Sequence, residues 1–178
     1  MSYRAKAILS FIVIALFSPA QAQTYSNWGM VFPTSQGGEA QEHFLEGVTD
    51  MHLHEFEDAG EHFRAAQRLA PDFAMAYWGE ALNQHRTIWS IHRLDTARAV
   101  LQRLGSTPGE RVAKAPTPRE KAYLGAVEIL FGEGIQVERQ SAYSTAMREL
   151  NEAYPDDIEA LAWYTLSLMR ETPPGMTR

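Results

Sequence analysis

Apolar and small residues recur every three or four positions through most of this 178-residue chain. That spacing places them on one face of an α-helix, and it predicts helices over 40–55, 58–70 and 73–86 followed by four more. No segment alternates convincingly as a strand. The sequence therefore predicts an all-α fold of about seven helices. Prolines stand between the periodic segments, where their rings cannot disrupt a helix; they are Pro71, Pro108, Pro116, Pro118 and Pro155.

Several short motifs predict where helices begin and end. Thr117 and Glu120 have the spacing of a capping box, and Pro118 stands where a first helical residue is expected. The carboxylates of 156–157 precede a periodic segment, so we interpret them as helix caps rather than catalytic acids. The glycines of 132–134 are typical of a helix C-cap and turn rather than of a phosphate-binding loop.

An internal repeat organises the chain on a larger scale. The segments Pro71–Ala76 and Pro155–Ala160 both open with Pro-Asp, and they start 84 residues apart. Two units of ~42 residues would fill that interval, a length typical of helical-pair repeats. Each hairpin of helices would bury its apolar face only by stacking on a neighbour. This pattern predicts a solenoid.

The first unit resembles the tetratricopeptide repeat family, through Gly47, Ala59, Phe63, Ala66 and Pro71 at the family's spacing. In that pattern small residues let the paired helices approach, and the aromatic ring fills the space between hairpins. The resemblance implies a right-handed α-solenoid over about 40–170 that binds peptides or proteins, without catalytic residues. The sequence at 76–81, AYWGEA, also looks like that of exported bacterial repeat proteins.

Residues 1–22 have the features of a secretory signal peptide. Arg4 and Lys6 precede an uncharged run of eleven residues, Ala7–Phe17, and Ala20–Ala22 forms a small-x-small cleavage site. The run is too short to span a bilayer, which needs ~20 residues. We therefore expect a periplasmic or secreted protein that starts at Gln23 and has no membrane span after cleavage.

The predicted divisions of the chain are a signal peptide at 1–22, an irregular lead-in at 23–39, a repeat domain at 40–170 and a tail at 171–178. The whole chain has 16 Lys and Arg against 22 Asp and Glu, a net charge of −6. Removal of Arg4 and Lys6 leaves 14 against 22, or −8. An acidic protein binds nucleic acid poorly, so none is expected as a partner. Because there is no cysteine, disulfides and thiolate chemistry are excluded.

A binding groove is predicted on the concave side of the solenoid, which the first helix of each hairpin would line. If Gly47 and Ala81 face inward, the opposite side of these helices presents apolar residues with a few polar ends. We expect this surface to bind a peptide or protein. The alternative is that Phe44, Met75 and Leu82 pack against the lead-in. The predicted groove residues are Phe44, Val48, His52, Met75, Trp78, Leu82, His85 and Arg86.

The histidines raise the question of a metal site. His52 and His54 point in opposite directions on one helix, so they cannot share an ion. A site that joins His52 and His85 from neighbouring first helices is the alternative to peptide binding, as part of a metal-dependent accessory protein. No His-Glu-x-x-His motif or catalytic constellation is present, so neither an enzyme nor a cofactor is predicted.

The last predicted helix, about 156–170, has apolar residues around much of its circumference. Only one face can pack on the preceding hairpin, and repeat proteins normally end on a polar face. We expect either that the chain is a piece of a longer repeat protein or that this edge is covered by self-association or by a partner.

Overall fold

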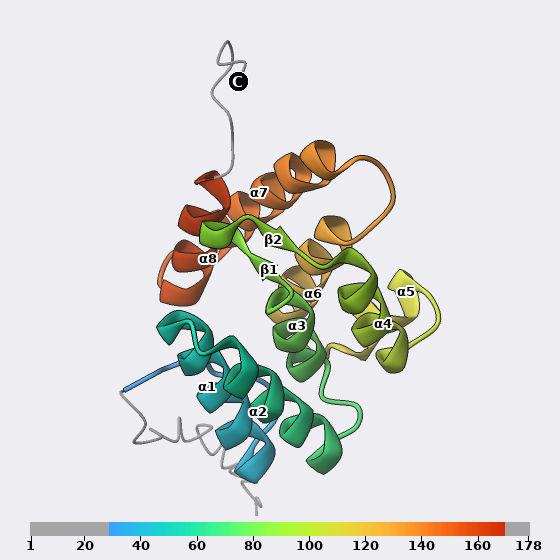
Figure 1. Cartoon of the computed structure of the whole chain (residues 1–178). Coiled ribbons are helices and arrows are strands. Elements are labelled where there is room, and N and C mark those ends of the chain that lie inside the picture. Colours follow the sequence, from blue (N-terminus) through green and yellow to red (C-terminus); the bar gives the residue numbers. More distant parts are fainter. Residues whose placement is uncertain (1–28, 170–178) are drawn as a thin grey trace, which may run out of the picture.

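The computed structural model describes residues 29–169, and this part of the chain is mostly helical, as the periodicity predicts (Figure 1). The predicted signal peptide and the predicted tail lie outside the described residues. The helices are α1 (Gly38–Leu53), α2 (Phe56–Leu69), α3 (Ala74–Leu82), α4 (Leu94–Leu104), α5 (Pro108–Lys114), α6 (Pro118–Leu130), α7 (Gln136–Ala153) and α8 (Ile158–Leu168). None of these helices is long and apolar enough to cross a membrane.

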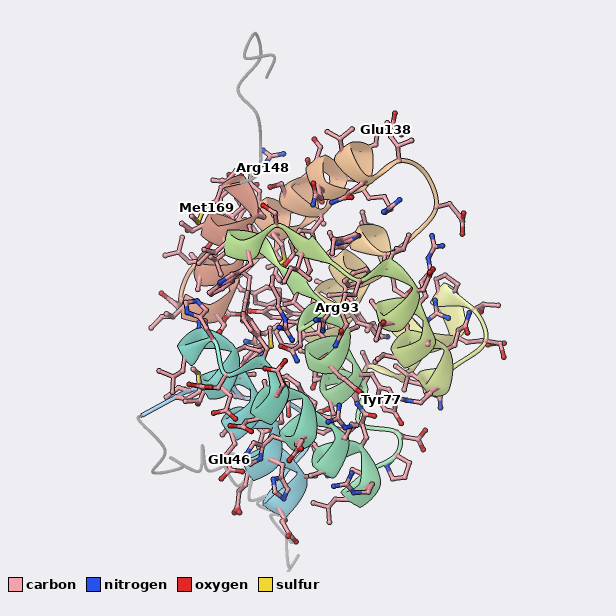
Figure 2. The ribbon with its side chains drawn as sticks, in the orientation of Figure 1. Glu46, Tyr77, Arg93, Glu138, Arg148 and Met169 are labelled. Atoms are coloured by element: carbon pink, nitrogen blue, oxygen red, sulfur yellow. The ribbon has the colours of Figure 1, made fainter. Side chains whose placement is uncertain are left out.

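Consecutive helices pack against each other: α1 on α2, α3 on α4, α6 on α7, and α8 on α7. The first helices of successive pairs also meet, since α3 contacts both α1 and α6. Side chains fill the space between the ribbons, whereas Glu138 and Arg148 project from the outer side of α7 (Figure 2).

Phe63 on α2 joins the first pair of helices to the next. A Cβ atom added at Gly47 on α1 would lie 2.8 Å from the Phe63 ring, and one added at Gly79 on α3 would lie 2.3 Å from it. Because neither glycine has a Cβ, both helices approach the ring closely. The predicted packing of small residues around Phe63 is therefore confirmed, although the small residue on α3 is Gly79 rather than Ala81.

The predicted caps are present at two helices. Thr117 and Glu120 form the capping box of α6, and the Asp157 side chain accepts a hydrogen bond from the backbone N–H of Ala160 at the start of α8. The same Thr-x-x-Glu spacing at Thr107 and Glu110 caps α5, a short helix that the sequence analysis did not predict. This helix lacks a long apolar period, so only its capping box marks it.

Two predictions are wrong in this region. The third helix does not continue to residue 86, and the chain does contain strands. Helix α3 ends at Leu82, and the antiparallel strands β1 (His85–Arg86) and β2 (Ile91–His92) form a hairpin through the 3-10 turn η1 (Thr87–Trp89). The Asn83 side chain donates to the backbone oxygen of Phe56 at 2.7 Å, which fixes the chain where it leaves the helix. Ser90 closes the turn in the left-handed region, with φ 59°.

The lead-in segment supplies the centre of the core. Phe32 is 1% exposed, and its ring centroid lies 5.2 Å from that of Phe44, 5.5 Å from that of Trp78 and 5.0 Å from that of Tyr123. These three rings come from α1, α3 and α6. Hydrogen bonds hold the segment in place: Ser35 N–H donates to Glu120 Oε1 at 2.7 Å. We call Phe32, Phe44, Trp78 and Tyr123 the central ring cluster.

Helix α8 carries apolar side chains that the described residues leave uncovered. Ile158 is 77% exposed and Leu161 is 51% exposed, and Met169, the residue that follows the helix, is 63% exposed. The expectation of uncovered apolar surface on the last helix is therefore confirmed. What covers that surface stays a prediction.

Candidate functional site

The predicted groove is not an open surface along its whole length. Phe44, Val48 and Met75 are 0% exposed and Trp78 is 1% exposed, so these four predicted groove residues belong to the core. The groove prediction is wrong for them because the inner sides of the first helices turn toward one another, and Phe32 fills the space between them. The alternative was that Phe44, Met75 and Leu82 pack against the lead-in, and it is confirmed for Phe44, whose ring lies 5.2 Å from that of Phe32.

The other four predicted groove residues, His52, Leu82, His85 and Arg86, line a cavity of about 410 Å³. It lies where the C-terminal ends of α1 and α3 meet the β1–β2 hairpin and α8. We call it the hairpin pocket. Its remaining lining residues are Met51, His54, Phe56, Asn83, Thr87, Ile88, Trp89, Tyr143, Ala162, Trp163, Thr165, Leu166 and Ser167.

Aromatic rings form the walls of the hairpin pocket. On the α8 side, the His52 ring stacks on Trp163 with centroids 4.9 Å apart and planes 24° apart. On the hairpin side, Trp89 meets His54 at 4.7 Å and Phe56 at 5.3 Å, both edge to face. Trp89 is 48% exposed, so it stands at the mouth of the pocket rather than in the core.

Arg86 brings a permanent positive charge to the pocket. Its guanidinium lies 4.3 Å from the centroid of the Phe56 ring, a cation–π distance. One terminal nitrogen, Nη2, donates to Glu57 at 3.2 Å, and the Glu57 side chain is 80% exposed. The guanidinium is therefore held by Phe56 and Glu57.

Three buried polar atoms of the pocket lack a hydrogen-bond partner among the described residues: Arg86 Nε, Trp163 Nε1 and Asn83 Oδ1. The first two are donors and the third is an acceptor. Leaving such a group buried and unpaired costs about 1–3 kcal/mol. Most buried polar groups in proteins are paired, so these three atoms mark the wall of the cavity as polar and incompletely bonded among the described residues.

The lining of the pocket contains basic residues but no carboxylate, although Glu57 and Glu159 bond to Arg86 and His52 from outside the lining. None of the described residues that line it is an aspartate or a glutamate, whereas Arg86 and three histidines do line it. Tyr143 adds a phenol whose pKa is raised by burial, so it stays protonated at neutral pH. The pocket can therefore donate hydrogen bonds to an anionic or acceptor group.

The histidines that the sequence analysis considered for a metal have different partners. His52 Nε2 lies 2.8 Å from Glu159 Oε2 on α8, and His85 Nδ1 lies 2.9 Å from His92 Nδ1 across the hairpin. His52 and His85 line the same pocket, yet each engages another side chain. This arrangement gives the predicted His52–His85 metal site no direct support. Among the described residues, His43, Glu46 and His62 form a separate group whose ligand atoms converge.

Sequence reasoning missed Phe56, Trp89 and Asn83 as pocket residues. One usable signal was the segment TIWSI at 87–91, in which large apolar residues follow a helix without continuing its period.

Comparisons with protein-family models, curated proteins and solved structures find no match to this chain.

Proposed function

We propose that this chain is an exported helical-repeat protein that binds a segment of a protein or peptide partner in the hairpin pocket. The observation that carries this proposal is a cavity of about 410 Å³ that is walled by the rings of Phe56, Trp89 and Trp163 and also lined by Arg86. Ligand sites are typically apolar cavities of about 300–1,000 Å³ with a few polar groups that orient the ligand.

The repeat architecture is part of the same proposal. Pairs of consecutive helices, the Phe63 ring between Gly47 and Gly79, and a Pro-Asp turn before both α3 and α8 support a right-handed solenoid of the tetratricopeptide kind. Such a solenoid would use its inner side for binding. In the part of the chain that the structure describes, the hairpin pocket would be the open part of that side.

The chemistry of the pocket favours one class of partner segment. The Arg86 guanidinium, with no acidic residue among the described lining residues, suits a carboxylate, while the rings of Phe56, Trp89 and Trp163 suit a large apolar side chain. A peptide that ends in an aromatic or branched apolar residue carries both groups. We therefore propose a partner with an apolar residue at its free C-terminus.

The pocket is tested by titrating the protein with N-acetyl-Leu-Phe and with its C-terminal amide while following tryptophan fluorescence. Arg86→Gln should weaken binding of the free acid about 10–100-fold, because a hydrogen bond to a charged group contributes about 1.5–3 kcal/mol. Arg93→Gln is the matched control, since Arg93 is exposed at the base of the same hairpin. Equal binding of acid and amide, or equal losses in both variants, would contradict the proposal.

Export is tested separately. N-terminal sequencing of the protein from its native cell should find Gln23 as the first residue. Retention of Met1 would contradict this part of the proposal. Crosslinking in the same cells would then identify the partner.

A further inference from the structure

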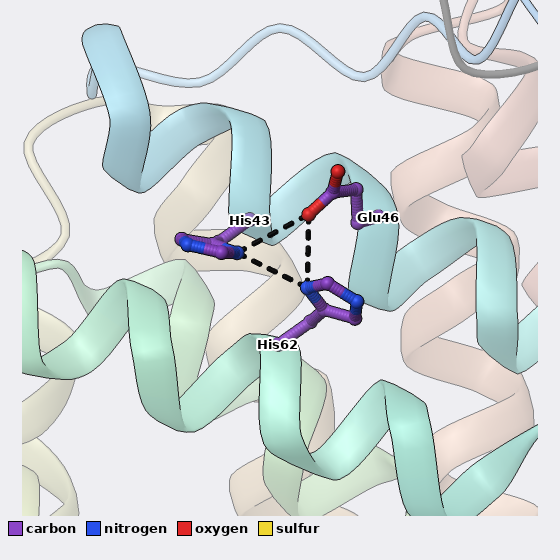
Figure 3. A group of neighbouring side chains, drawn as sticks. All are labelled: His43, Glu46 and His62. Carbon is purple, nitrogen blue, oxygen red and sulfur yellow. Dashed lines mark hydrogen bonds and ion pairs between the residues drawn. The ribbon is translucent and has the colours of Figure 1, made fainter.

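The exposed side of the first helical pair carries a group of side chains that the hairpin pocket does not use. His43 and Glu46 lie three residues apart on α1, and His62 faces them from α2 (Figure 3). The side chains are 29%, 31% and 32% exposed respectively, so water and ions can reach them.

The three ligand atoms form a nearly regular triangle. His43 Nδ1 lies 3.1 Å from His62 Nδ1 and 3.2 Å from Glu46 Oε2, and His62 Nδ1 lies 2.9 Å from Glu46 Oε2. Zinc binds histidine nitrogen and carboxylate oxygen at ~2.0–2.2 Å, so ligand atoms of a tetrahedral site stand about 3.3 Å apart. The triangle needs to widen by only a few tenths of an ångström to hold such an ion.

The surroundings of the triangle favour a cation. Asp50 Oδ2 lies 3.7 Å from the other ring nitrogen of His62, Nε2. A carboxylate on the far side of a metal-bound imidazole is a common way to orient the ring and to strengthen it as a ligand. The segment 38–69, which contains both helices, also has eight acidic residues against two arginines.

We propose that His43, Glu46 and His62 bind one divalent transition-metal ion, with zinc as the probe ion. Two imidazoles and a carboxylate are ligands that zinc accepts, and three protein ligands leave a fourth position for water. Because the ligands come from both α1 and α2, the bound ion ties the two helices together. The site is distinct from the hairpin pocket, and it does not depend on the function proposed there.

The test uses the untagged chain after treatment with a chelator, titrated with zinc chloride in a calorimeter. One zinc ion should bind per chain, with micromolar or tighter affinity, and should raise the temperature of unfolding. Loss of a group that only orients a metal ligand typically costs 10–100-fold in metal affinity. His43→Gln, Glu46→Gln and His62→Gln each remove a proposed ligand itself, so each should weaken zinc binding by about 100-fold or more.

Glu42→Gln is the matched control for Glu46→Gln. It removes the same charge from the same helix at an exposed position outside the triangle, and its zinc affinity should equal that of the unchanged protein. Circular dichroism checks that each variant is folded; if a histidine variant is not, the comparison of Glu46→Gln with Glu42→Gln decides. Zinc binding that is absent, or that survives all three ligand substitutions, would overturn the proposal.

Discussion

The central ring cluster and the hairpin pocket differ in how their aromatic surfaces are covered. Both lie on the inner side of the first helices, and Trp163 borders both. The centroid of the Trp163 ring lies 6.1 Å from that of Trp78, and the same ring stacks on His52. In the central ring cluster, Phe32 from the lead-in segment covers the aromatic surface. In the hairpin pocket no described side chain covers it.

The difference shows that an apolar face of these helices stays open only where the chain itself does not cover it. Apolar residues at repeat positions do not distinguish the two cases, because both kinds of surface use the same residue types. Unpaired polar atoms do not distinguish them either, since Trp78 Nε1 in the cluster lacks a partner among the described residues just as Arg86 Nε and Asn83 Oδ1 do at the pocket. Exposure does distinguish them: Trp78 is 1% exposed and Trp89 is 48% exposed. The comparison predicts that substitutions in the cluster affect folding and that substitutions in the pocket affect binding.

Trp78→Ala should have the largest effect on stability. The Trp78 ring contacts Phe32, Tyr123 and Trp163, and the residue is 1% exposed. Truncating a buried tryptophan costs ~3–5 kcal/mol of unfolding free energy. Denaturant unfolding measures this loss. A change in unfolding free energy below about 1 kcal/mol would contradict the place of Trp78 in the core and favour the original prediction that it lies on the binding surface.

Phe32→Ala tests whether the lead-in is part of the folded core. The ring is buried, and it also lies 4.7 Å from the Arg119 guanidinium. Truncating a buried phenylalanine or tryptophan costs about 3–5 kcal/mol of unfolding free energy, and we expect Phe32→Ala to lie near the lower end of that range, at about 3 kcal/mol. Thermal unfolding should show one transition at a lower temperature. A variant as stable as the unchanged protein would mean that the lead-in does not fill the cluster, and the comparison would fail.

Tyr143→Phe sharpens the picture of the pocket wall. Burial raises the pKa of Tyr143, so the folded state keeps its proton after the unfolded state releases it near pH 10. This contribution to stability is complete below pH 10 and is lost as the pH rises above it. Between pH 10 and 11, the unchanged protein should lose about 1 kcal/mol more than Tyr143→Phe.

Unfolding experiments at both pH values give that difference directly. Tyr77 and Tyr123, whose pKa values are also raised mainly by burial, titrate in both proteins and cancel in the comparison. Equal losses of stability in the unchanged protein and in Tyr143→Phe would show that water reaches the Tyr143 phenol, and hence that this wall of the pocket is hydrated.

Trp89→Ala should have the smallest effect on stability and a clear effect on binding. The ring is about half exposed on the hairpin turn, so we expect its removal to cost no more than about 0.5–1 kcal/mol. The variant should retain its helical circular dichroism while losing affinity for N-acetyl-Leu-Phe. A loss of stability as large as that of Trp78→Ala would show that the hairpin is core, not a pocket wall.

The sequence predicted the parts of this fold that depend on neighbouring residues. Helical period, the Thr117–Glu120 box and the role of Phe63 all rest on short spacings, and the structure confirms them. The β-hairpin was missed because each strand has two residues, which is too short for alternation to appear.

The sites depended on contacts that no local pattern contains. His52 and Glu159 are 107 positions apart in the sequence, yet they meet beside the hairpin pocket, and Phe32 from the lead-in closes the rest of the predicted groove. The triangle of His43, Glu46 and His62 was missed for a similar reason. The i, i+3 spacing of His43 and Glu46 is visible in the sequence, but the position of His62 opposite them depends on how α2 packs on α1.

The position of Phe32 also has a consequence for the order of folding. The lead-in bonds to residues far along the chain: Ser35 to Glu120, and Arg119 to the backbone oxygen of Pro33. A repeat protein in which each unit touches only its neighbours can fold one unit at a time. Here the core cannot close until α6 has been synthesised and has met the N-terminal segment. We therefore expect slow, all-or-none folding, with Phe32 exposed to water until that step.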